Sequence, residues 1–452
     1  MAIGWWRDFV NPASFYAAQS PILRITFITG MTPFTVMKVG RKYVLQCTAF
    51  GYLNSIIQTA IICICFAVSL INQESITRYF FSTEISVLGN SLQFFTGLSA
   101  FVMTFFYSVF RRDRLIRAFH SLAKTDEHFK EIGVETDYRS TLLYNCFIMI
   151  YQVIIQIVYI GISVAVLFAS NIHPRFTAWV AFFIPYLMMA TIIVLFLCLV
   201  NQTKHRFYLL NKVLRSLQEI SLEKKLPAYD ETQNPAKKIR FQKPLRILSS
   251  TFWNTNRYMP EVITRVASIQ DELCDACNSV QEYFKVQMLT IVTITFLIVV
   301  FNVYYILEII FTKHMSTTPC TQFQFILFFG FQAMIHAFGV LKIIFVSSLA
   351  VQENDKIAVN VHKLINVNNY DDEAVKQLSN LSLQLTHRKV AFTAYGLFNL
   401  DFTLLFTLTG AATTYLVILV QFTINQNELC GQKLINSTIV SLVKNGSLLQ
   451  ND

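Results

Sequence analysis

The chain has 452 residues, of which 54% are hydrophobic and 14% are charged, and its mean hydropathy is +0.46. Soluble domains are about 45–50% apolar and about 25% charged, so this composition excludes an ordinary soluble enzyme. Basic residues outnumber acidic residues by 37 to 27, which gives a net charge of +10. In a membrane protein such an excess is typical of basic loops on the cytosolic side, and we expect no nucleic-acid partner.

Seven stretches of the chain are apolar over the length of about 20 residues that a helix needs to cross a bilayer. They are Val44–Ile71, Ile85–Phe110, Thr141–Ser170, Phe176–Val200, Phe284–Phe311, Phe323–Leu349 and Phe398–Ile424. The sequence therefore predicts an all-α membrane protein with seven transmembrane helices in contact with lipid. Met1–Ser20 carries Arg7 and Asp8 where a secretory signal has its apolar core, so we expect the first span to direct insertion.

Lysine and arginine are distributed unevenly among the segments between these spans. Five precede the first span, seven follow the second, fourteen lie between the fourth and fifth if Lys285 is included, and five follow the sixth. The three alternate loops carry one each, Arg78, Arg175 and Lys313. Basic residues accumulate in cytosolic loops, so we expect an inside N-terminus and an outside C-terminus. This orientation is opposite to that of a G-protein-coupled receptor.

The predicted outer side carries two cysteines and two glycosylation motifs. Cys320 and Cys430 would lie on the oxidising side, where they either form a disulfide or remain as thiols. Asn436-Ser-Thr and Asn445-Gly-Ser are acceptor motifs that only an outside tail could use.

Apolar periodicity predicts that two helices continue beyond the membrane on the inner side. The periodic positions are Phe207, Leu210, Leu214 and Leu217 after the fourth span, and Val262, Val266, Ile269, Leu273, Val280 and Phe284 before the fifth. We expect these extensions to pack together as a cytosolic stalk. The expected segments are a cytosolic N-terminal segment 1–43, six transmembrane helices 44–349 with cytosolic extensions in 201–283, a cytosolic anchor segment 350–397, a seventh helix 398–424, and an extracellular tail 425–452.

Motifs of the common enzyme and metal-site classes are absent from the sequence. There is no phosphate-binding GxxxxGK(S/T) loop, no HExxH, no EF-hand loop and no glycine-rich dinucleotide turn. Cys274 and Cys277 form a single CxxC without the second pair that a structural zinc site needs. We therefore expect no enzymatic activity, no cofactor and no metal. The inverted repeats and interrupted spans of many secondary transporters are also absent.

The seventh stretch carries small and polar side chains on one helical face. Ala411, Thr414, Ile418, Gln421 and Asn425 recur at steps of three and four residues. Such a face meets either another helix, which small residues allow to approach closely, or a water-filled pathway. The residues alone leave both readings open.

The string from Thr414-Tyr415 to Gln421-Phe422 resembles the TYhhhhhQF signature of insect gustatory receptors, in which h is a hydrophobic residue. Ala394, Gly396, Phe398 and Asp401 are also similar to that family's approach to its last span. The resemblance extends over the whole chain and is strongest from about Trp253 to Phe422.

This resemblance implies a ligand-gated, non-selective channel for monovalent and divalent cations in the plasma membrane of sensory neurons. It implies a homotetramer, or a heteromer with other receptors, in which the seventh helix of each subunit lines a central pore. Gln421 and Phe422 would form the gate, with Ile418 on the same face and with Thr414 and Tyr415 in the pore helix and its packing. A ring of four phenylalanines blocks ions by dewetting. We expect Asp401 to pair with Arg388 rather than to attract cations.

The resemblance also implies a ligand pocket in the outer half of the first six spans. Polar and aromatic residues predicted at that depth are Asn90, Gln93, Gln156, Tyr159, Trp179, Tyr186, Tyr304, Tyr305, Glu308, Gln332 and His336. The eight that we expect to bind the ligand are Asn90, Gln156, Trp179, Tyr186, Tyr305, Glu308, Gln332 and His336. Each of them has an alternative role in helix packing. Aromatic faces cover the C–H surface of a sugar while amides and carboxylates bind its hydroxyls, so the set favours a fructose-type sugar receptor.

Two alternatives remain within this resemblance. A receptor for bitter compounds would need mostly aromatic residues and one anion. An odorant-receptor-like subunit would require a co-receptor to conduct. Glu308 is the most discriminating residue, because a carboxylate inside a span marks a functional site by default.

Overall fold

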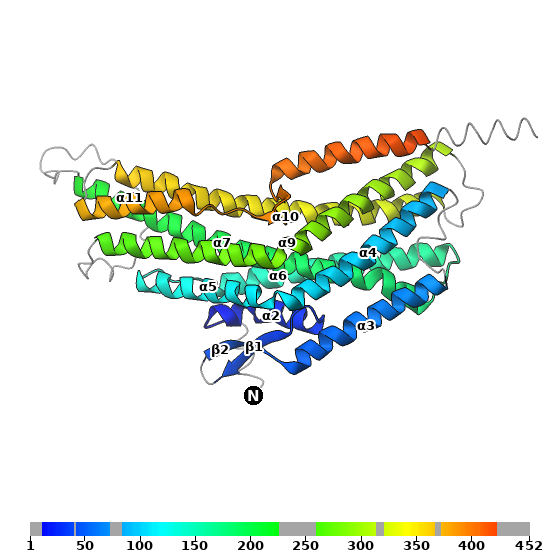
Figure 1. Ribbon diagram of the computed structural model, residues 1–452, viewed down its shortest axis with the longest axis horizontal. Helices are drawn as coiled ribbons and strands as arrows, with labels where there is room; N and C mark the ends of the chain where they lie inside the picture. Colours follow the sequence, from blue (N-terminus) through cyan, green and yellow to red (C-terminus); the bar gives the residue numbers. More distant parts are fainter. Residues whose placement is uncertain are drawn as a thin grey trace, which may run out of the picture.

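The chain forms an elongated bundle of helices, several of which run along most of its length (Figure 1). The computed structural model describes residues 11–39, 42–72, 84–225, 259–312, 321–366 and 372–422. The elements are α2 (Phe15–Ile28), β1 (Phe34–Val39), β2 (Lys42–Cys47), α3 (Ala49–Ile71), α4 (Glu84–Phe110), α5 (Arg112–Glu131), α6 (Tyr138–Ala169), α7 (Phe176–Lys225), α9 (Met259–Thr312), α10 (Gln322–Ile365), α11 (Asp372–His387), β3 (Thr393–Ala394), β4 (Phe398–Asn399) and the last helix (Phe402–Phe422).

Seven of these helices are long and apolar enough to cross a membrane, which confirms the predicted number of spans. The expectation of an all-α chain needs a small correction, because β1 pairs with β2 and β3 pairs with β4 in two antiparallel hairpins. These hairpins change the start of two spans.

The first span begins at Ala49 and not at Val44, because Lys42–Cys47 is strand β2 and Thr48 caps the helix. The hydroxyl of Thr48 accepts a hydrogen bond from the Gly51 backbone N–H at 3.1 Å. Such side-chain caps satisfy a donor that the first turn of a helix leaves unpaired.

The last helix begins at Phe402 and not at Phe398, because strand β4 occupies Phe398–Asn399. A carboxylate oxygen of Asp401 accepts a hydrogen bond from the Thr403 backbone N–H at 2.9 Å and so caps the helix.

The predicted N-terminal segment folds against the bundle. Asn145 on α6 donates from its side-chain amide to the Gln19 side chain at 3.0 Å and to the Ala18 carbonyl at 3.3 Å, which fixes α2. Asn54 on α3 donates to the Phe27 carbonyl at 2.7 Å. Residues 11–39 of the N-terminal segment are therefore a structured part of the bundle.

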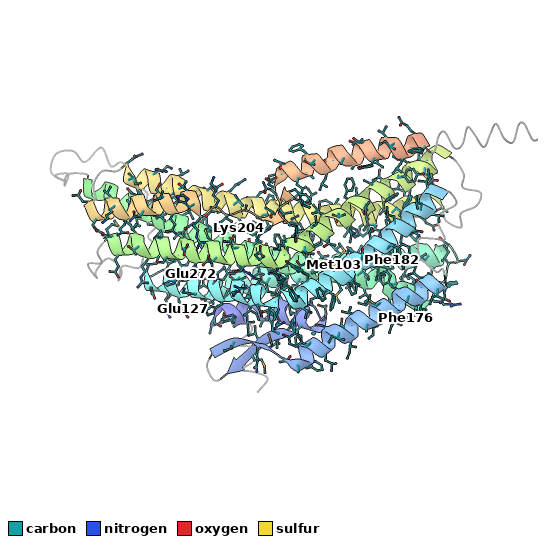
Figure 2. The ribbon with its side chains drawn as sticks, viewed as in Figure 1. Met103, Glu127, Phe176, Phe182, Lys204 and Glu272 are labelled. Atoms are coloured by element: carbon teal, nitrogen blue, oxygen red, sulfur yellow. The ribbon has the colours of Figure 1, made fainter. Side chains whose placement is uncertain are left out.

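The helices α7, α9 and α10 are each continuous from the spans into a second half of the molecule, which we call the stalk. The stalk consists of α5, α11, the part of α7 after residue 201, the part of α9 before residue 283 and the part of α10 after residue 350. All ten periodic positions predicted on α7 and α9 are buried, which confirms the extensions and their packing. Glu127, Lys204 and Glu272 lie in the stalk, and Phe176 and Phe182 lie in the other half, which we call the span half (Figure 2).

A buried ion pair joins α5 to α7 in the stalk. The Arg206 guanidinium donates to both carboxylate oxygens of Asp126, at 2.9 and 2.7 Å, and both side chains are 3% exposed. The guanidinium carbon also lies 4.9 Å from the centre of the Phe15 ring on α2. Removal of one partner would leave a buried charge without compensation, which is costly.

Candidate functional site

A cavity of about 110 Å³ lies in the span half, between α3, α4, α6, α7, α9 and α10. Tyr186 is ten residues from the start of α7 at Phe176, or about 15 Å at the helical rise, so the cavity reaches the middle of the spans. Its lining side chains are Phe66, Ser69, Asn90, Gln93, Phe94, Tyr159, Phe182, Tyr186, Met189, Gln332 and His336, with small or apolar residues between them.

Four of the eight residues predicted to bind ligand line this cavity: Asn90, Tyr186, Gln332 and His336. Gln93 and Tyr159, which the sequence also places at this depth, line it too. Phe66 and Phe94, whose ring centroids lie 4.8 Å apart, are aromatic members that the sequence analysis missed. A phenylalanine facing a cavity has the same sequence pattern as one that faces lipid or another helix.

The other four predicted residues lie outside the cavity lining. Trp179 stacks on Phe183 at 5.4 Å, and Tyr305 donates to the Ser86 carbonyl at 3.5 Å. Glu308 accepts a short hydrogen bond from the Ser86 hydroxyl. Gln156 is buried, and within the described parts of the chain neither of its amide atoms has a hydrogen-bond partner. Glu308 therefore joins α9 to α4 instead of reaching the cavity.

Two tyrosine hydroxyls at the cavity have no hydrogen-bond partner among the described residues. The rings of Tyr159 and Tyr186 meet edge to face at 5.1 Å, and the Tyr186 ring lies 5.1 Å from the His336 ring. Neither hydroxyl makes a hydrogen bond to any residue that the structure describes. A buried polar atom without a partner costs free energy, so these hydroxyls favour a ligand that offers hydrogen bonds.

The remaining polar groups of the cavity are held in place. The Asn302 amide donates to the Gln332 side chain at 3.2 Å and to the Phe329 carbonyl at 3.4 Å. The His336 Nδ1 lies 2.9 Å from the Gln332 carbonyl oxygen.

Pro185, which also lines the cavity, has no N–H to donate to the carbonyl of Ala181 one turn earlier.

The lining residues described for this cavity carry no aspartate, glutamate, lysine or arginine. The site therefore combines aromatic faces with amides, hydroxyls and one imidazole. A neutral ligand with several hydroxyls satisfies such groups better than a cation, for which the lining offers no carboxylate.

The last helix stands on one side of the bundle, along α9 (Figure 1). Only 6% of its most apolar stretch is buried within the chain, against 22–61% for the other six spans. Tyr415 meets Phe296 of α9 edge to face at 5.9 Å, and Leu416 and Leu419 pack against the buried cluster that contains Tyr304, Tyr305 and Phe329. Thr414, Ile418, Gln421 and Phe422 are exposed, so the predicted pore face is turned away from the core of the chain.

The hydroxyls of exposed threonines on this helix donate hydrogen bonds to backbone carbonyls of the same helix. Thr407 donates to the Thr403 carbonyl at 3.0 Å, and Thr413 and Thr414 both donate to the Gly410 carbonyl, at 2.8 and 3.0 Å. The helix can therefore face lipid, a neighbouring subunit or a pore without unpaired hydroxyls.

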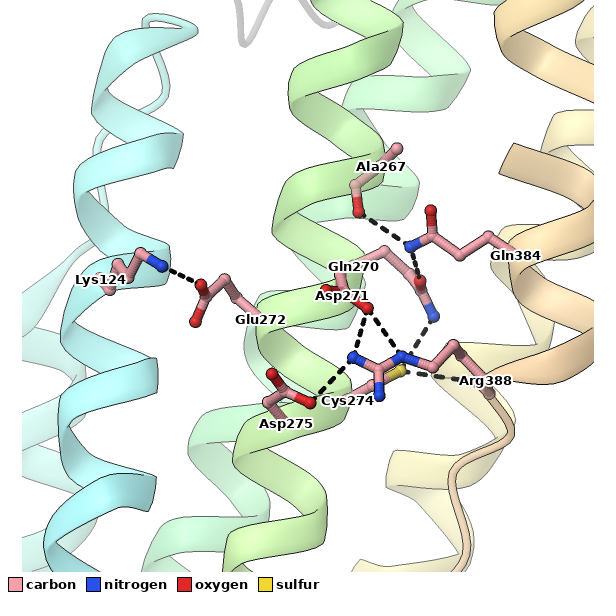
Figure 3. Close-up of polar contacts among 9 residues, drawn as sticks. All are labelled: Lys124, Ala267, Gln270, Asp271, Glu272, Cys274, Asp275, Gln384 and Arg388. Carbon is pink, nitrogen blue, oxygen red and sulfur yellow. Dashed lines mark hydrogen bonds and ion pairs between the residues drawn. The ribbon is translucent and has the colours of Figure 1, made fainter. Parts of the chain in front are cut away.

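Arg388 does not pair with Asp401, contrary to our expectation, and binds the stalk part of α9 instead (Figure 3). Its guanidinium donates to Asp271 and, at 2.8 Å, to Asp275. Partial burial opposes the charge, but these two carboxylates outweigh it and raise the pKa of Arg388. The expectation failed because Asp401 is used to cap the last helix.

Further hydrogen bonds extend this attachment on both sides of Arg388. Gln384 on α11 donates to the Gln270 side chain at 2.6 Å and to the Ala267 carbonyl at 3.0 Å (Figure 3). Thr393 exchanges hydrogen bonds with the side chain of Gln281, which donates to the Thr393 carbonyl at 2.6 Å and accepts from its N–H at 2.8 Å. The segment that leads into the last helix is thereby bound to α9.

Several predicted features lie outside the described residues: Cys320, Cys430, Asn436 and Asn445, and with them the tail 425–452. Cys274 and Cys277 are buried in the stalk, and Cys274 Sγ lies 3.6 Å from the Arg388 carbonyl. Within the described ranges no group of three or more potential metal ligands occurs.

Comparison with known proteins gives a match to the family model described as 7tm Chemosensory receptor over residues 19–426. The chain belongs to this seven-transmembrane chemosensory receptor family. It is therefore a multi-pass membrane receptor for small molecules and not an enzyme. The receptor is 33% identical to putative gustatory receptor 28a of Drosophila melanogaster over 432 residues, which cover 93% of this chain and 95% of the relative. It is 31% identical to putative gustatory receptor 28b of the same species over 429 residues, which cover 93% and 88%.

The fold of the receptor is similar to that of the insect olfactory receptor OR5 from Machilis hrabei in complex with eugenol. The TM-score is 0.60, and the similarity covers 90% of this chain and 97% of that chain. At 12% sequence identity this similarity establishes the fold alone.

Proposed function

We propose that this receptor is a gustatory receptor that acts as a ligand-gated, non-selective cation channel for monovalent and divalent ions. Four copies assemble around a central pore lined by the last helix, alone or with related receptors. The exposed face of that helix carries this proposal. A helix with Thr414, Ile418 and Gln421 turned away from its own bundle needs another surface or water to cover it.

The gate in this proposal is formed by Phe422 and Gln421 at the end of the last helix. Phe422 is 58% exposed in the single chain and would face its three counterparts in the tetramer. Four phenylalanine rings form a constriction too apolar for water, and a rotation that brings in Gln421 would rewet it.

The proposed orientation places the N-terminus and the stalk in the cytosol and the C-terminus outside, in the plasma membrane of sensory neurons. The distribution of lysine and arginine supports it. In this orientation the cavity opens in the outer half of the spans, where a tastant would arrive.

We propose a sugar such as fructose as the tastant. The neutral cavity, with its amides and two unpartnered tyrosine hydroxyls, supports a polyhydroxy ligand over a cationic bitter compound. A neutral bitter compound remains the second candidate, and a subunit that requires a co-receptor is the third. The receptor also shares 26% identity over 164 residues with the gustatory receptor for bitter taste 66a of Drosophila melanogaster.

The first test is whole-cell current from cells that express only this chain, during perfusion with sugars and then bitter compounds at equal osmolarity. We expect a prompt cation current to one sugar. A current only to bitter compounds would overturn the choice of ligand. Silence despite surface expression, followed by current when a related receptor is co-expressed, would overturn the homotetramer.

A further inference from the structure

A second cavity, of about 210 Å³, lies between α6, α7 and α10, and Thr295 of α9 also lines it. We call it the lateral groove. Its walls are mainly apolar: Ile155, Met189, Ala190, Ile193, Phe331, Met334, Ile335, Phe338 and Gly339. Met334 and Phe338 are more than half exposed, so the groove opens on a face of the spans that meets lipid.

The groove contains one cation at its end nearest the stalk. Lys342 lines it, and the ammonium lies 4.4 Å from the centre of the Tyr151 ring. No carboxylate that the structure describes pairs with Lys342, whereas Lys124 and Lys356 of the stalk pair with Glu272 and Glu353. A lysine near the end of a span can extend its ammonium to the membrane interface, where lipid phosphates lie.

The position of Lys342 along the membrane follows from helix geometry. It is twenty residues from the start of α10 at Gln322, or about 30 Å at the helical rise, which equals the thickness of the hydrocarbon core. The ammonium is therefore at one membrane boundary, and the apolar walls extend from it toward the middle of the bilayer.

We propose that the lateral groove binds an anionic phospholipid of the inner leaflet, with its phosphate on the Lys342 ammonium and an acyl chain along the apolar walls. Charge and shape both support this occupant, because an anionic head and an apolar tail match the two ends of the groove. The assignment to the inner leaflet depends on the proposed orientation of the receptor; binding of the lipid itself does not.

The bound lipid would touch the ligand cavity through a shared wall. Tyr186, Met189 and His336 line both cavities. An acyl chain that reaches this part of the groove therefore contacts side chains whose other side faces the ligand. The lipid composition of the membrane would thereby influence how tightly the receptor holds its ligand.

The test is lipid retention by the purified full-length receptor, measured by native mass spectrometry after incubation with equal amounts of phosphatidylserine and phosphatidylcholine. Wild type should retain phosphatidylserine in preference, and Lys342→Gln should lower that retention about fivefold, the factor that corresponds to ~1 kcal/mol for one basic residue near an anionic lipid surface. Lys342→Arg should retain it. Lys363→Gln removes an exposed charge from the same helix outside the groove and should behave as wild type.

A second variant tests the apolar part of the groove without changing its charge. A Cβ at Gly339 would lie 3.3 Å from the Ile193 side chain, so Gly339→Leu narrows the groove. It should lower phosphatidylserine retention while Lys342 remains. Size-exclusion profiles identify any variant that misfolds.

Three outcomes would overturn the proposal. Equal retention by Lys342→Gln and Lys363→Gln would show that Lys342 does not bind lipid, and equal retention of both lipids by wild type would remove the preference for an anion. Displacement of the lipid by millimolar inorganic phosphate would show a site for a free anion. Because this experiment uses no tastant and no current, its failure is separate from a failure of the proposed channel function.

Discussion

The stalk and the span half of this receptor use their polar side chains in opposite ways. The ion pairs between described residues lie in the stalk or at its junction with the spans, such as Arg206 with Asp126 and Lys124 with Glu272. Both cavities lie in the span half, where Tyr159 and Tyr186 have buried hydroxyls without a described partner. Apart from Asn354 Oδ1, the described buried polar side chains of the stalk are thus satisfied by their own neighbours, and the span half is incomplete without small molecules.

This difference indicates that the stalk sets the shape of the receptor and that the span half responds to the ligand. A network of paired charges resists rearrangement, because breaking a buried pair costs a large amount of free energy. A site with unsatisfied groups gains free energy when a ligand arrives, which is the basis of a shift between conformations. Four experiments test this difference between the stalk and the span half.

The largest effect is expected when the buried ion pair of the stalk is broken. Arg206→Met leaves the Asp126 carboxylate buried without its partner and should lower the free energy of unfolding by about 3–5 kcal/mol. The measurement is thermal denaturation of the purified receptor. The double variant with Asp126→Leu should recover most of the loss, because no charge remains buried.

Arg265→Met is the matched control for this experiment. It removes the arginine of an exposed pair with Glu131, in which both side chains are more than 40% exposed. Such pairs contribute about 0–1 kcal/mol. A similar loss of stability in Arg206→Met and Arg265→Met would contradict the view that burial gives the stalk its rigidity.

The next effect concerns the gate. Phe422→Ala should raise the basal current severalfold in the absence of ligand, because the apolar constriction becomes wide enough to hold water. Val417→Ala is the control, since Val417 lies on a different face of the same helix. An unchanged leak together with a normal ligand response would remove Phe422 from the gate.

A smaller effect is expected at the ligand cavity. Tyr186→Phe removes only a hydroxyl that has no described partner, so stability should not fall. The tastant loses one hydrogen bond, so the half-maximal concentration should rise about 2- to 12-fold, which corresponds to ~0.5–1.5 kcal/mol. Tyr208→Phe, an exposed tyrosine of the stalk, should leave the dose–response curve unchanged. Equal curves for the two variants would place the ligand elsewhere.

The smallest effect is expected at Arg388, which binds Asp271 and Asp275 at the stalk surface. Its side chain is 33% exposed, so Arg388→Gln should cost no more than about 1 kcal/mol of stability. Thermal denaturation measures this loss. A loss as large as that of Arg206→Met would mean that the attachment of α11 and the last helix to α9 is a central part of the fold.

Lys124, on the stalk helix α5, shows how an ion pair of the stalk responds to pH. A hydrogen bond to Glu272 raises the pKa of Lys124 above its usual value. The lysine's contribution to stability is therefore present through neutral pH and is lost only as the pH rises past the raised pKa.

The sequence by itself determined the features that depend on local pattern. Apolar runs predicted seven spans, and the steps of three and four residues from Phe207 to Leu217 predicted a helix that continues into the stalk, because helical periodicity is a property of neighbouring residues. The motif from Thr414 to Phe422 pointed to the chemosensory receptor family. Residue type and predicted depth placed Asn90 and Gln332 among the candidates for the cavity.

Only the tertiary structure decided which of these residues meet. Glu308 joins Ser86 on α4 instead of the cavity, and Arg388 binds Asp271, 117 positions away, instead of the nearer Asp401. The lateral groove at Lys342 also has no sequence signature. The physical reason is the same in each case: a side chain's partner is set by how helices distant in sequence pack, and periodicity gives the face of a helix but not the neighbour that it meets.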